Sequence, residues 1–337
     1  MFSGEESPMS SSVNLATRPS NSSKACEFIY ESPPFVPVIL TPSVLPVQGD
    51  VKRREGLRMH TETLEKPGAA AGLPDGTLLH REELRSPAKG IALYVLTYAS
   101  QGLQVKGYLA VPQRAVPAPG LIFCRGGIRK VGMVRKRRIL SMARRGYVVF
   151  APFYRGNEGG EGREDFGGED RHDVCGAISL VQSLPEVKPG PVPLIGFSRG
   201  ALMALLAARE CDQAGPVVVW SGVSDLFDTY EERVDLRRML KRVVGHPRKQ
   251  AEAYEDRSPV YWIDEIRVPV LIVHGTGDTQ VSVEQARKLG TALEEAGKEY
   301  RMELYDGLDH RFPKEEDEQA LDAVFGWITD KLAAGRG

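Results

Sequence analysis

The chain has 337 residues, a formal net charge of −1 at pH 7 and a hydrophobic content of 42%, which suits one large α/β domain with additional segments. The balanced charge gives no reason to expect a nucleic acid or an anionic membrane surface as a partner. Because there is no run of about eighteen apolar residues and no basic segment followed by an apolar one at the start, we expect a cytoplasmic protein without a membrane span.

The first 77 residues differ in composition from the rest of the chain. They are rich in Ser, Pro and Gly and have no sustained periodicity, which predicts a poorly ordered tail. A part of this tail could instead dock on the domain, because Phe28, Ile29, Tyr30 and Phe35 are apolar. We expect the catalytic domain to occupy residues 78–337.

The pattern becomes regular after residue 78. Two alternating runs, Ile91–Tyr98 and Gln104–Val111, flank a short turn and predict an antiparallel hairpin. Further strands are expected at 120–124, 147–152, 192–197, 216–220, 268–275 and 300–306, with helices near 133–145, 170–184, 201–209, 226–256, 282–297 and 317–333. Strands that alternate with helices predict a mostly parallel sheet with helices on both faces.

The region 226–262 interrupts this rhythm of strands and helices. Its pattern predicts two amphipathic helices and a turn. They could pack over the sheet edge, or form a small cap with one wall of a substrate cleft. In the second case Tyr230, Tyr261 and Trp262 are candidates for lining that cleft.

Three residues suited to nucleophilic catalysis follow predicted strands. Ser198 follows VPLIGF, Asp278 follows VPVLIVHGTG, and His310 follows YRMELYDGLD. In an open α/β sheet, active residues gather at the carboxyl ends of the strands. A serine hydroxyl needs a base beside it. We expect the histidine to remove its proton and later deliver that proton to the leaving group, while the aspartate orients the imidazole.

The motif GFSRG has a simpler explanation, since a serine before a helix can be an ordinary cap. Asp278 could likewise be a turn residue, and Asp225 is a rival acid. The strand–turn–helix setting and the order Ser, Asp, His favour catalysis, because this order is typical of α/β-hydrolases. Gly196 and Gly200 allow a sharp turn, and the helix start supplies N–H groups to a developing oxyanion.

Several segments together resemble the catalytic domain of the prolyl oligopeptidase family of serine peptidases. They are GFSRGALMA, FYRGNEGGEGREDFGGED, SGVSDLF, HGTGDTQVSVEQARKL and GLDHRF. The likeness extends from about Tyr94 to the C-terminus. It implies an α/β-hydrolase fold, no cofactor, and catalytic roles for Ser198, Asp278 and His310. The expected activity is cleavage of short peptides or amides through an acyl-enzyme, with a carboxylesterase acting on small esters, or a non-catalytic binding protein, as alternatives.

The sequence departs from the family pattern at two points. Large members carry a β-propeller that limits substrates to short peptides, whereas only about ninety residues precede the hairpin here. Many members have an oxyanion-binding tyrosine where this chain has Arg125. We therefore expect backbone N–H groups of Arg199, Arg125 and Gly126 to form the oxyanion hole. The Arg125 guanidinium could contribute, or could pair with an acid such as Glu158.

The remaining features allow weaker predictions. Tyr154, in the motif Tyr154-Arg155-Gly156, and Trp262 are candidate substrate-binding residues. The glycine-rich loop 155–170 matches no nucleotide-binding motif, and no metal-site spacing occurs. The stretch 128–146 is rich in Lys and Arg without any acid, so it forms either a solvated face or a surface that favours carboxylate substrates. The four scattered cysteines are expected to be reduced thiols.

Overall fold

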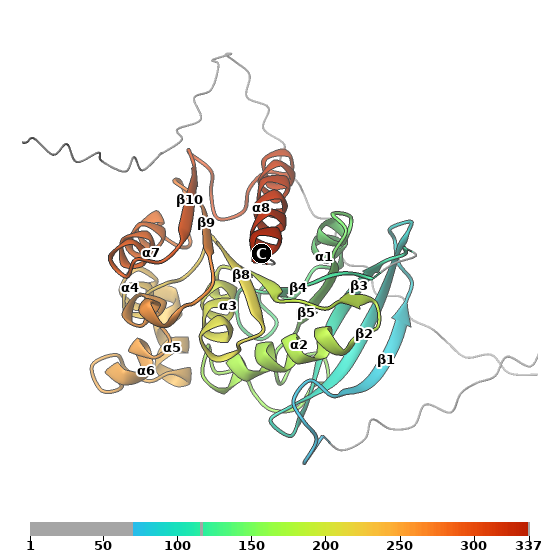
Figure 1. Cartoon of the computed structure of the whole chain (residues 1–337). Helices are drawn as coiled ribbons and strands as arrows, with labels where there is room; N and C mark the ends of the chain where they lie inside the picture. Colours follow the sequence, from blue (N-terminus) through green and yellow to red (C-terminus); the bar gives the residue numbers. More distant parts are fainter. Residues whose placement is uncertain (1–69, 115–116, 336–337) are drawn as a thin grey trace, which may run out of the picture. The chain divides into compact units, whose positions relative to one another are not determined.

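The computed structural model describes residues 70–114 and 117–335 (Figure 1). Most of the predicted tail, residues 1–69, lies outside the described residues. Residues 70–77 lead into the first strand: the Gly76 N–H donates to the Ala99 carbonyl at 2.8 Å, and the Asp75 carboxylate accepts from the Gln101 N–H at 2.6 Å. The boundary at residue 77 stays a prediction.

A mixed sheet organises the chain. Its strands are β1 (Leu78–Leu84), β2 (Ile91–Ser100), β3 (Leu103–Pro112), β4 (Ala118–Cys124), β5 (Val148–Pro152), β6 (Val187–Lys188), β7 (Val192–Phe197), β8 (Ala214–Trp220), β9 (Val270–Gly275) and β10 (Tyr300–Tyr305). The order is β1-β2-β3-β5-β4-β7-β8-β9-β10, and β6 pairs with β4. The pairs β1–β2, β2–β3 and β3–β5 are antiparallel. The pairs from β5–β4 to β9–β10 are parallel. The expected hairpin and mostly parallel sheet are confirmed.

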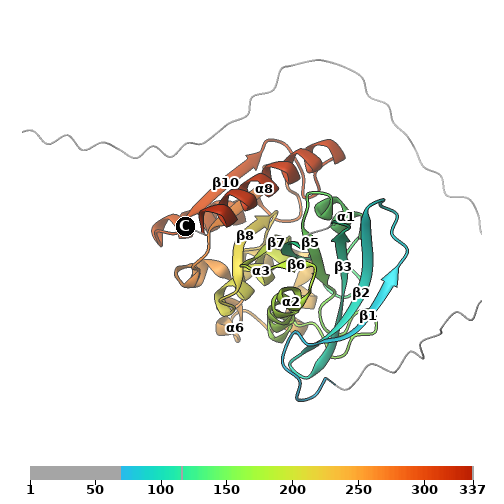
Figure 2. The same ribbon diagram turned by 45° about the vertical axis from the view of Figure 1, so that its right-hand side comes forward.

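Helices cover both faces of this sheet. They are α1 (Lys136–Ala143), α2 (His172–Ser183), α3 (Arg199–Glu210), α4 (Leu226–Glu232), α5 (Arg237–Val243), α6 (Ala251–Glu255), α7 (Val283–Glu295) and α8 (Lys314–Ala334). Figure 2 shows α1 and α8 on one side of the sheet and α2 and α3 on the other. Among the described residues, none of the helices is long and apolar enough to cross a membrane.

Each central strand contributes to two hydrophobic cores because its side chains alternate between the faces. In β7, Leu194 packs with the core beneath α2, α3 and α7, while Ile195 packs with the core beneath α1 and α8. All four of the residues Leu194, Ile195, Val217 and Val218 are fully buried. The continuous apolar runs in the sequence therefore reflect strands that are covered on both sides.

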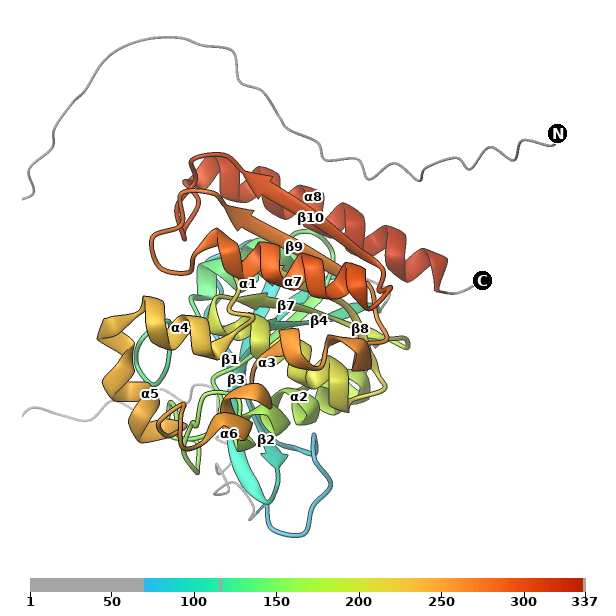
Figure 3. The same cartoon turned by 90° about the vertical axis from the view of Figure 1, so that its left-hand side faces the viewer.

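The region 226–262 forms three short helices rather than the expected two. Figure 3 shows α4, α5 and α6 lying together beside the sheet. Pro247 lies between the end of α5 and the start of α6, and a proline cannot continue a helix because it lacks the N–H and clashes with the preceding turn. The 3₁₀ turns Val234–Leu236 and Pro259–Tyr261 complete the segment.

The prediction of reduced thiols is wrong for two cysteines. Cys175 in α2 and Cys211, which follows α3, form a disulfide. The two residues are 36 positions apart, and the packing of α2 beside α3 brings them together. A local sequence pattern therefore could not predict the bond. Cys124 is free and buried, and burial raises the pKa of its thiol to about 12; such a thiol is unreactive at neutral pH. Cys26 lies outside the described residues.

The close approach of α3 to β4 generates a stability prediction. A Cβ added to Gly200 would lie 2.0 Å from the Cys124 carbonyl oxygen, a backbone atom that cannot move aside. We expect Gly200→Ala to lower the free energy of unfolding by about 1–3 kcal/mol, the usual cost of overpacking, as measured by chemical denaturation. The control is Gly326→Ala in α8, where a Cβ would meet no atom within 4 Å. Equal denaturation midpoints for the two variants would contradict the packing described.

Candidate active site

Ser198 occupies a strained turn between β7 and α3. Its φ of 57° and ψ of −127° lie in a region that residues with a Cβ seldom adopt. Its N–H donates to the Trp220 carbonyl of β8 at 3.0 Å, which fixes the turn against the sheet. A Cβ on Gly196 would lie 2.3 Å from the Gly200 carbonyl oxygen, so the turn requires glycine at this position. The Ser198 side chain makes no capping hydrogen bond to α3, unlike an ordinary helix cap.

Asp278 and His310 form a buried pair. The His310 Nδ1 lies 2.8 Å from Asp278 Oδ2, and the two side chains are 3% and 0% exposed. Although burial raises the pKa of Asp278, hydrogen bonds from His274, His310 and the Val281 N–H hold it well below its usual range. The carboxylate is therefore ionised at neutral pH, as the orientation of an imidazole in one tautomer requires.

The imidazole of His310 lies beside the serine turn. Its ring centroid is 4.9 Å from that of Phe197, the residue before Ser198. Ser198 and His310 also line the same cleft. The structure thus brings together Ser198, Asp278 and His310, the three residues that follow predicted strands in the sequence.

The rival acid Asp225 is engaged elsewhere. Its side chain caps α4 by accepting from the Phe227 N–H at 2.7 Å, and it also pairs with Lys288. Asp309, the neighbour of His310, accepts from the Thr279 N–H at 2.8 Å. Among the described residues, Asp278 is the carboxylate that bonds the His310 ring.

Sequence reasoning missed His274, a second histidine that contacts Asp278. Its Nε2 lies 3.2 Å from Asp278 Oδ2 and 2.9 Å from the Val281 carbonyl oxygen. The side chain is fully buried. His274 and His310 therefore both contact the same carboxylate oxygen of Asp278. The available signal was the spacing of four residues across a turn at the end of a strand, in HGTGD.

The glycine loop after β4 approaches the serine closely. A Cβ on Gly126 would lie 2.8 Å from Ser198 Cβ and 3.3 Å from its Oγ. The guanidinium of Arg125 is buried and donates to the Phe153 and Gly126 carbonyl oxygens at 3.0 Å. Its acidic partner is Glu164, not the suggested Glu158. The side chain of Arg125 is thus committed to structural bonds.

Glu164 connects the loops around the serine, and sequence reasoning missed it too. Its carboxylate, 2% exposed, accepts from the guanidinium groups of Arg125 and Arg199, the Asn157 amide and the Arg129 N–H. Arg199, the first residue of α3, also donates to the Gly127 carbonyl at 2.7 Å and pairs with Asp170. One buried carboxylate therefore ties the glycine loop, the loop 155–170 and the start of α3 together.

The two predicted substrate-binding aromatics do not line the cleft, so this prediction is wrong. Tyr154 is fully buried, and its hydroxyl donates to the Arg125 carbonyl at 3.2 Å. Trp262 is 5% exposed, and its Nε1 donates to the Asp256 carbonyl at 3.1 Å. Both rings pack against guanidinium groups, at 5.0 Å from Arg199 and 4.8 Å from Arg209 respectively, so the two aromatics support the fold instead.

The cleft beside Ser198 has a volume of about 1110 Å³. One wall comes from residues 125–141, which include most of the predicted basic stretch, and another from residues 223–239 of the helical region. The interpretation of 226–262 as a cap that forms one wall of the cleft is thus partly supported, because Thr229, Leu236 and Met239 line the cleft. Of the suggested lining residues, Tyr230 and Tyr261 are absent from the cleft walls.

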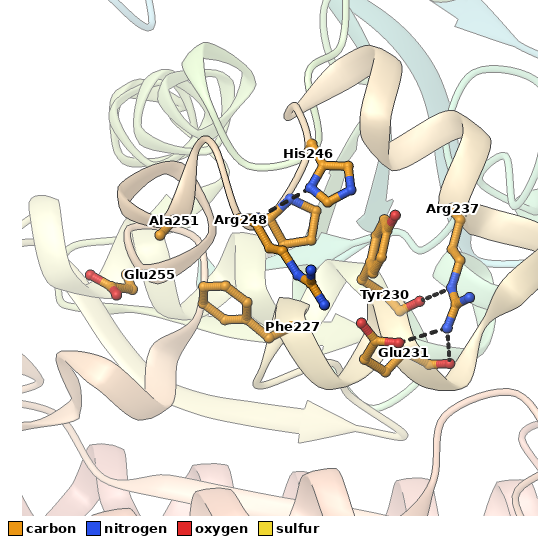
Figure 4. Close-up of a pocket in the computed structure, with 9 residues that line it drawn as sticks. Phe227, Tyr230, Glu231, Arg237, His246, Arg248, Ala251 and Glu255 are labelled. Carbon is orange, nitrogen blue, oxygen red and sulfur yellow. Dashed lines mark hydrogen bonds and ion pairs between the residues drawn. The ribbon is translucent and has the colours of Figure 1, made fainter.

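A second hollow lies within the helical region itself. It has a volume of about 670 Å³, and Figure 4 shows its lining from Phe227 to Glu255. Arg237, one of its cations, already donates to the Tyr230 carbonyl at 2.8 Å and pairs with Glu231 at 2.7 Å. None of its lining residues also lines the cleft beside Ser198.

Comparison with known proteins decides the family. A model described as the prolyl oligopeptidase family matches residues 133–335, which is more than half of the chain. The chain belongs to the prolyl oligopeptidase family. The resemblance found in the sequence motifs is confirmed, and this family member is an enzyme of the serine hydrolase kind.

Several relatives of this family member are known. The uncharacterized peptidase YtmA of Bacillus subtilis (strain 168) is 43% identical over 256 residues, which cover 75% of this chain and 100% of YtmA. A puromycin-hydrolyzing peptidase of Mycobacterium tuberculosis shares the fold, with a TM-score of 0.62, 23% identity, and coverage of 75% of this chain and 39% of that one. An acetyl xylan esterase from Paenibacillus sp. R4 has a TM-score of 0.60, 16% identity, and coverage of 74% and 88%. The predicted α/β-hydrolase fold is thereby confirmed.

The Glu164 cluster predicts a large stability effect. In Glu164→Gln, the buried guanidinium groups of Arg125 and Arg199 lose a shared anion, and breaking a buried pair costs about 3–5 kcal/mol. We expect this decrease in the free energy of unfolding in urea titrations. Glu158→Gln, at an exposed position nearby, is the matched control and should unfold like the wild type. A Glu164→Gln variant as stable as that control would refute the bridging role.

The lowered pKa of Asp278 predicts a pH-dependent stability. A carboxyl whose pKa is depressed on folding stabilises the native state above its unfolded pKa of about 3.9, and this contribution is lost as the pH falls below that value. We therefore expect Asp278→Asn to be less stable than the wild type at pH 7, with a difference that shrinks below about pH 4. Thermal unfolding across this range measures it, with the exposed Asp264→Asn as the control at pH 7. A difference that stays constant with pH would contradict the hydrogen bonding that favours the ionised carboxylate of Asp278.

Proposed function

We propose that this chain is a serine peptidase that hydrolyses short peptides or amides through an acyl-enzyme on Ser198. The observation that carries the proposal is the buried Asp278–His310 hydrogen bond beside Ser198. The backbone of this serine is strained, and its side chain makes no capping hydrogen bond to α3. In this account Asp278 orients the His310 imidazole through Nδ1, and Nε2 receives the proton of the serine hydroxyl. His274 is a positioning residue that holds Asp278.

The proposed reaction has two halves. Ser198 Oγ attacks the carbonyl carbon while His310 takes the hydroxyl proton, and the resulting tetrahedral intermediate carries an oxyanion. In this account backbone N–H groups of Arg199 and of the Arg125–Gly126 segment bind that oxyanion, which the packing of Gly126 against the serine and the start of α3 at Arg199 support. His310 then protonates the leaving amine. In the second half a water, deprotonated by His310, releases the acyl group from Ser198.

A carboxylesterase is the second candidate function. The acetyl xylan esterase with this fold is 88% covered by the match, so little of that enzyme lies outside the shared fold. The puromycin-hydrolyzing peptidase is only 39% covered. The chemistry of the serine and histidine is the same for an ester and an amide, since only the leaving group differs. The 43% identity with a protein named as a peptidase favours peptides or amides.

We retain a cytoplasmic location as part of the proposal. Structural disulfides are uncommon in that compartment, and the Cys175–Cys211 bond makes the expectation testable. Mass spectrometry of protein alkylated in denaturant at the moment of cell lysis should find four alkylated cysteines if the bond is absent in the cell, as a cytoplasmic location predicts, and two if it is present.

A comparison of wild type with Ser198→Ala tests the proposed activity. The substrates are aminoacyl and dipeptidyl anilides paired with short-chain p-nitrophenyl esters. We expect the wild type to hydrolyse the anilides and the variant to lose at least about 10³-fold in kcat. Ser179→Ala, an exposed serine on α2, controls for the substitution itself. Turnover of esters alone would support the esterase, and equal rates for wild type and Ser198→Ala would remove the serine from the mechanism.

A further inference from the structure

Five cations in the cleft form no ion pair with an acid in the described ranges 70–114 and 117–335. They are Lys130, Arg135, Arg137, Arg311 and Lys314, here called the basic wall, and all of them line the cleft that holds Ser198. We infer that the basic wall selects substrates that carry a carboxylate close to the scissile bond, as in short peptides with a free C-terminus or an acidic side chain. This inference rests on the proposed function, because it names the substrate class of the same site.

The other charges in the cleft are already neutralised by neighbours. Arg138 pairs with Asp317 at 2.6 Å, and Arg233 pairs with Asp235 at 2.7 Å. Glu318 is taken by Arg145 at 2.9 Å. For the five members of the basic wall, no ion pair with a described residue occurs. Among the described lining residues the cleft therefore has more cations than acids, although the net charge of the whole chain is −1.

The remaining acid of the cleft is a single carboxylate, which offsets at most one of the five charges. Glu232 lies on α4, and burial together with the carboxylates of Asp228 and Asp225 raises its pKa. Those acids have their own cation, since Lys288 pairs with both Asp225 and Asp228. The acids of the helical region thus have their own cation, and the two cleft acids that follow Lys314 in α8, Asp317 and Glu318, pair with Arg138 and Arg145.

The basic wall lies on two segments that adjoin the reacting groups. Lys130, Arg135 and Arg137 follow the glycine loop that packs against Ser198, and Arg311 directly follows His310. The Arg311 guanidinium lies 5.6 Å from the ring centroid of Phe197, the residue before the serine. A carboxylate close to the scissile bond would therefore lie near a cation.

Apolar lining strengthens this electrostatic attraction. The cleft contains aromatic and aliphatic side chains beside the cations, namely Phe123, Val131, Met133, Val134, Phe197 and Phe312. Low-dielectric walls focus the field of charges of one sign in a cleft and raise the local concentration of an oppositely charged ligand. The volume of about 1110 Å³ suits a small molecule or short peptide. Part of the basic stretch thus lines the cleft, which favours a role in substrate selection over a solvated face alone.

Isosteric substrates test the basic wall directly. We would measure kcat/KM for short peptides with a free C-terminal carboxylate against the same peptides as C-terminal amides, and for Glu-containing against Gln-containing versions. We expect the anionic member of each pair to be preferred by about 5- to 10-fold at low salt, with the preference reduced in 0.5 M NaCl by screening. Equal kcat/KM values within both pairs, at both salt concentrations, would overturn the inference.

Charge-removing variants locate the effect. Arg311→Gln and the double variant Arg135→Gln/Arg137→Gln should each reduce the ratio of the anionic to the neutral substrate, mainly through KM. All three positions are exposed, so the fold should tolerate these changes. Lys89→Gln, an exposed cation that does not line the cleft, is the matched control and should keep the wild-type ratio. A ratio that none of the cleft variants changes would also overturn the inference.

Binding to the inactive variant separates the two proposals. Calorimetric titration of Ser198→Ala with the same peptide acids and amides needs no turnover. Tighter binding of the peptide acids would support the basic wall even if the wild type hydrolysed neither peptide. The lack of hydrolysis would then count only against the proposed peptidase activity. Equal dissociation constants for acid and amide would reject the basic wall even where both peptides are hydrolysed.

Discussion

The positive-φ turn at Ser198 is the constraint around which the active-site region is built. The turn closes only because Gly200 can approach the β4 backbone at Cys124 and Gly196 can approach the start of α3. It leaves the serine side chain outside the capping interactions of the helix. The strain of such a backbone must be balanced by surrounding structure, and here the sheet supplies the bond from the Ser198 N–H to the Trp220 carbonyl.

The buried charge cluster reinforces the same turn from the other side. Glu164 holds the guanidinium of Arg199 at the start of α3 and that of Arg125 at the start of the glycine loop. A buried carboxylate between two arginines is stable only when its lone pairs are satisfied, and Asn157 with the Arg129 N–H completes the set. The elements that would bind a developing oxyanion are therefore positioned by side-chain bonds as well as by the backbone.

Features with a local sequence signal could be predicted, and features made by tertiary packing could not. The apolar runs predicted the strands of the sheet. The residues that follow these runs predicted that Ser198, Asp278 and His310 lie together at the carboxyl ends of the strands. The strand β1 was missed because LLHREEL is an exposed, charged edge strand without an apolar run. Glu164 and the Cys175–Cys211 bond join segments that are distant in the chain, so composition and spacing did not reveal them.

The wrong substrate-binding predictions have a similar origin. Aromatic residues near a glycine-rich motif suggested a cleft lining, yet Tyr154 and Trp262 are buried and bonded to backbone carbonyls. The residues that do line the cleft include many from the basic stretch, together with Thr229, Leu236 and Met239 of the helical region. Because the same fold serves peptidases and esterases, substrate choice depends on these walls rather than on the catalytic residues.

The central claim is that Ser198 forms a covalent acyl-enzyme. Trapping this intermediate is its most direct measurement: the protein is mixed with an activated ester, quenched in acid, digested, and mapped by mass spectrometry. The account predicts one acyl group per chain on the peptide that contains Ser198, and its accumulation should depend on His310. An acyl group on another residue, or turnover of the ester without any acyl adduct, would contradict the account.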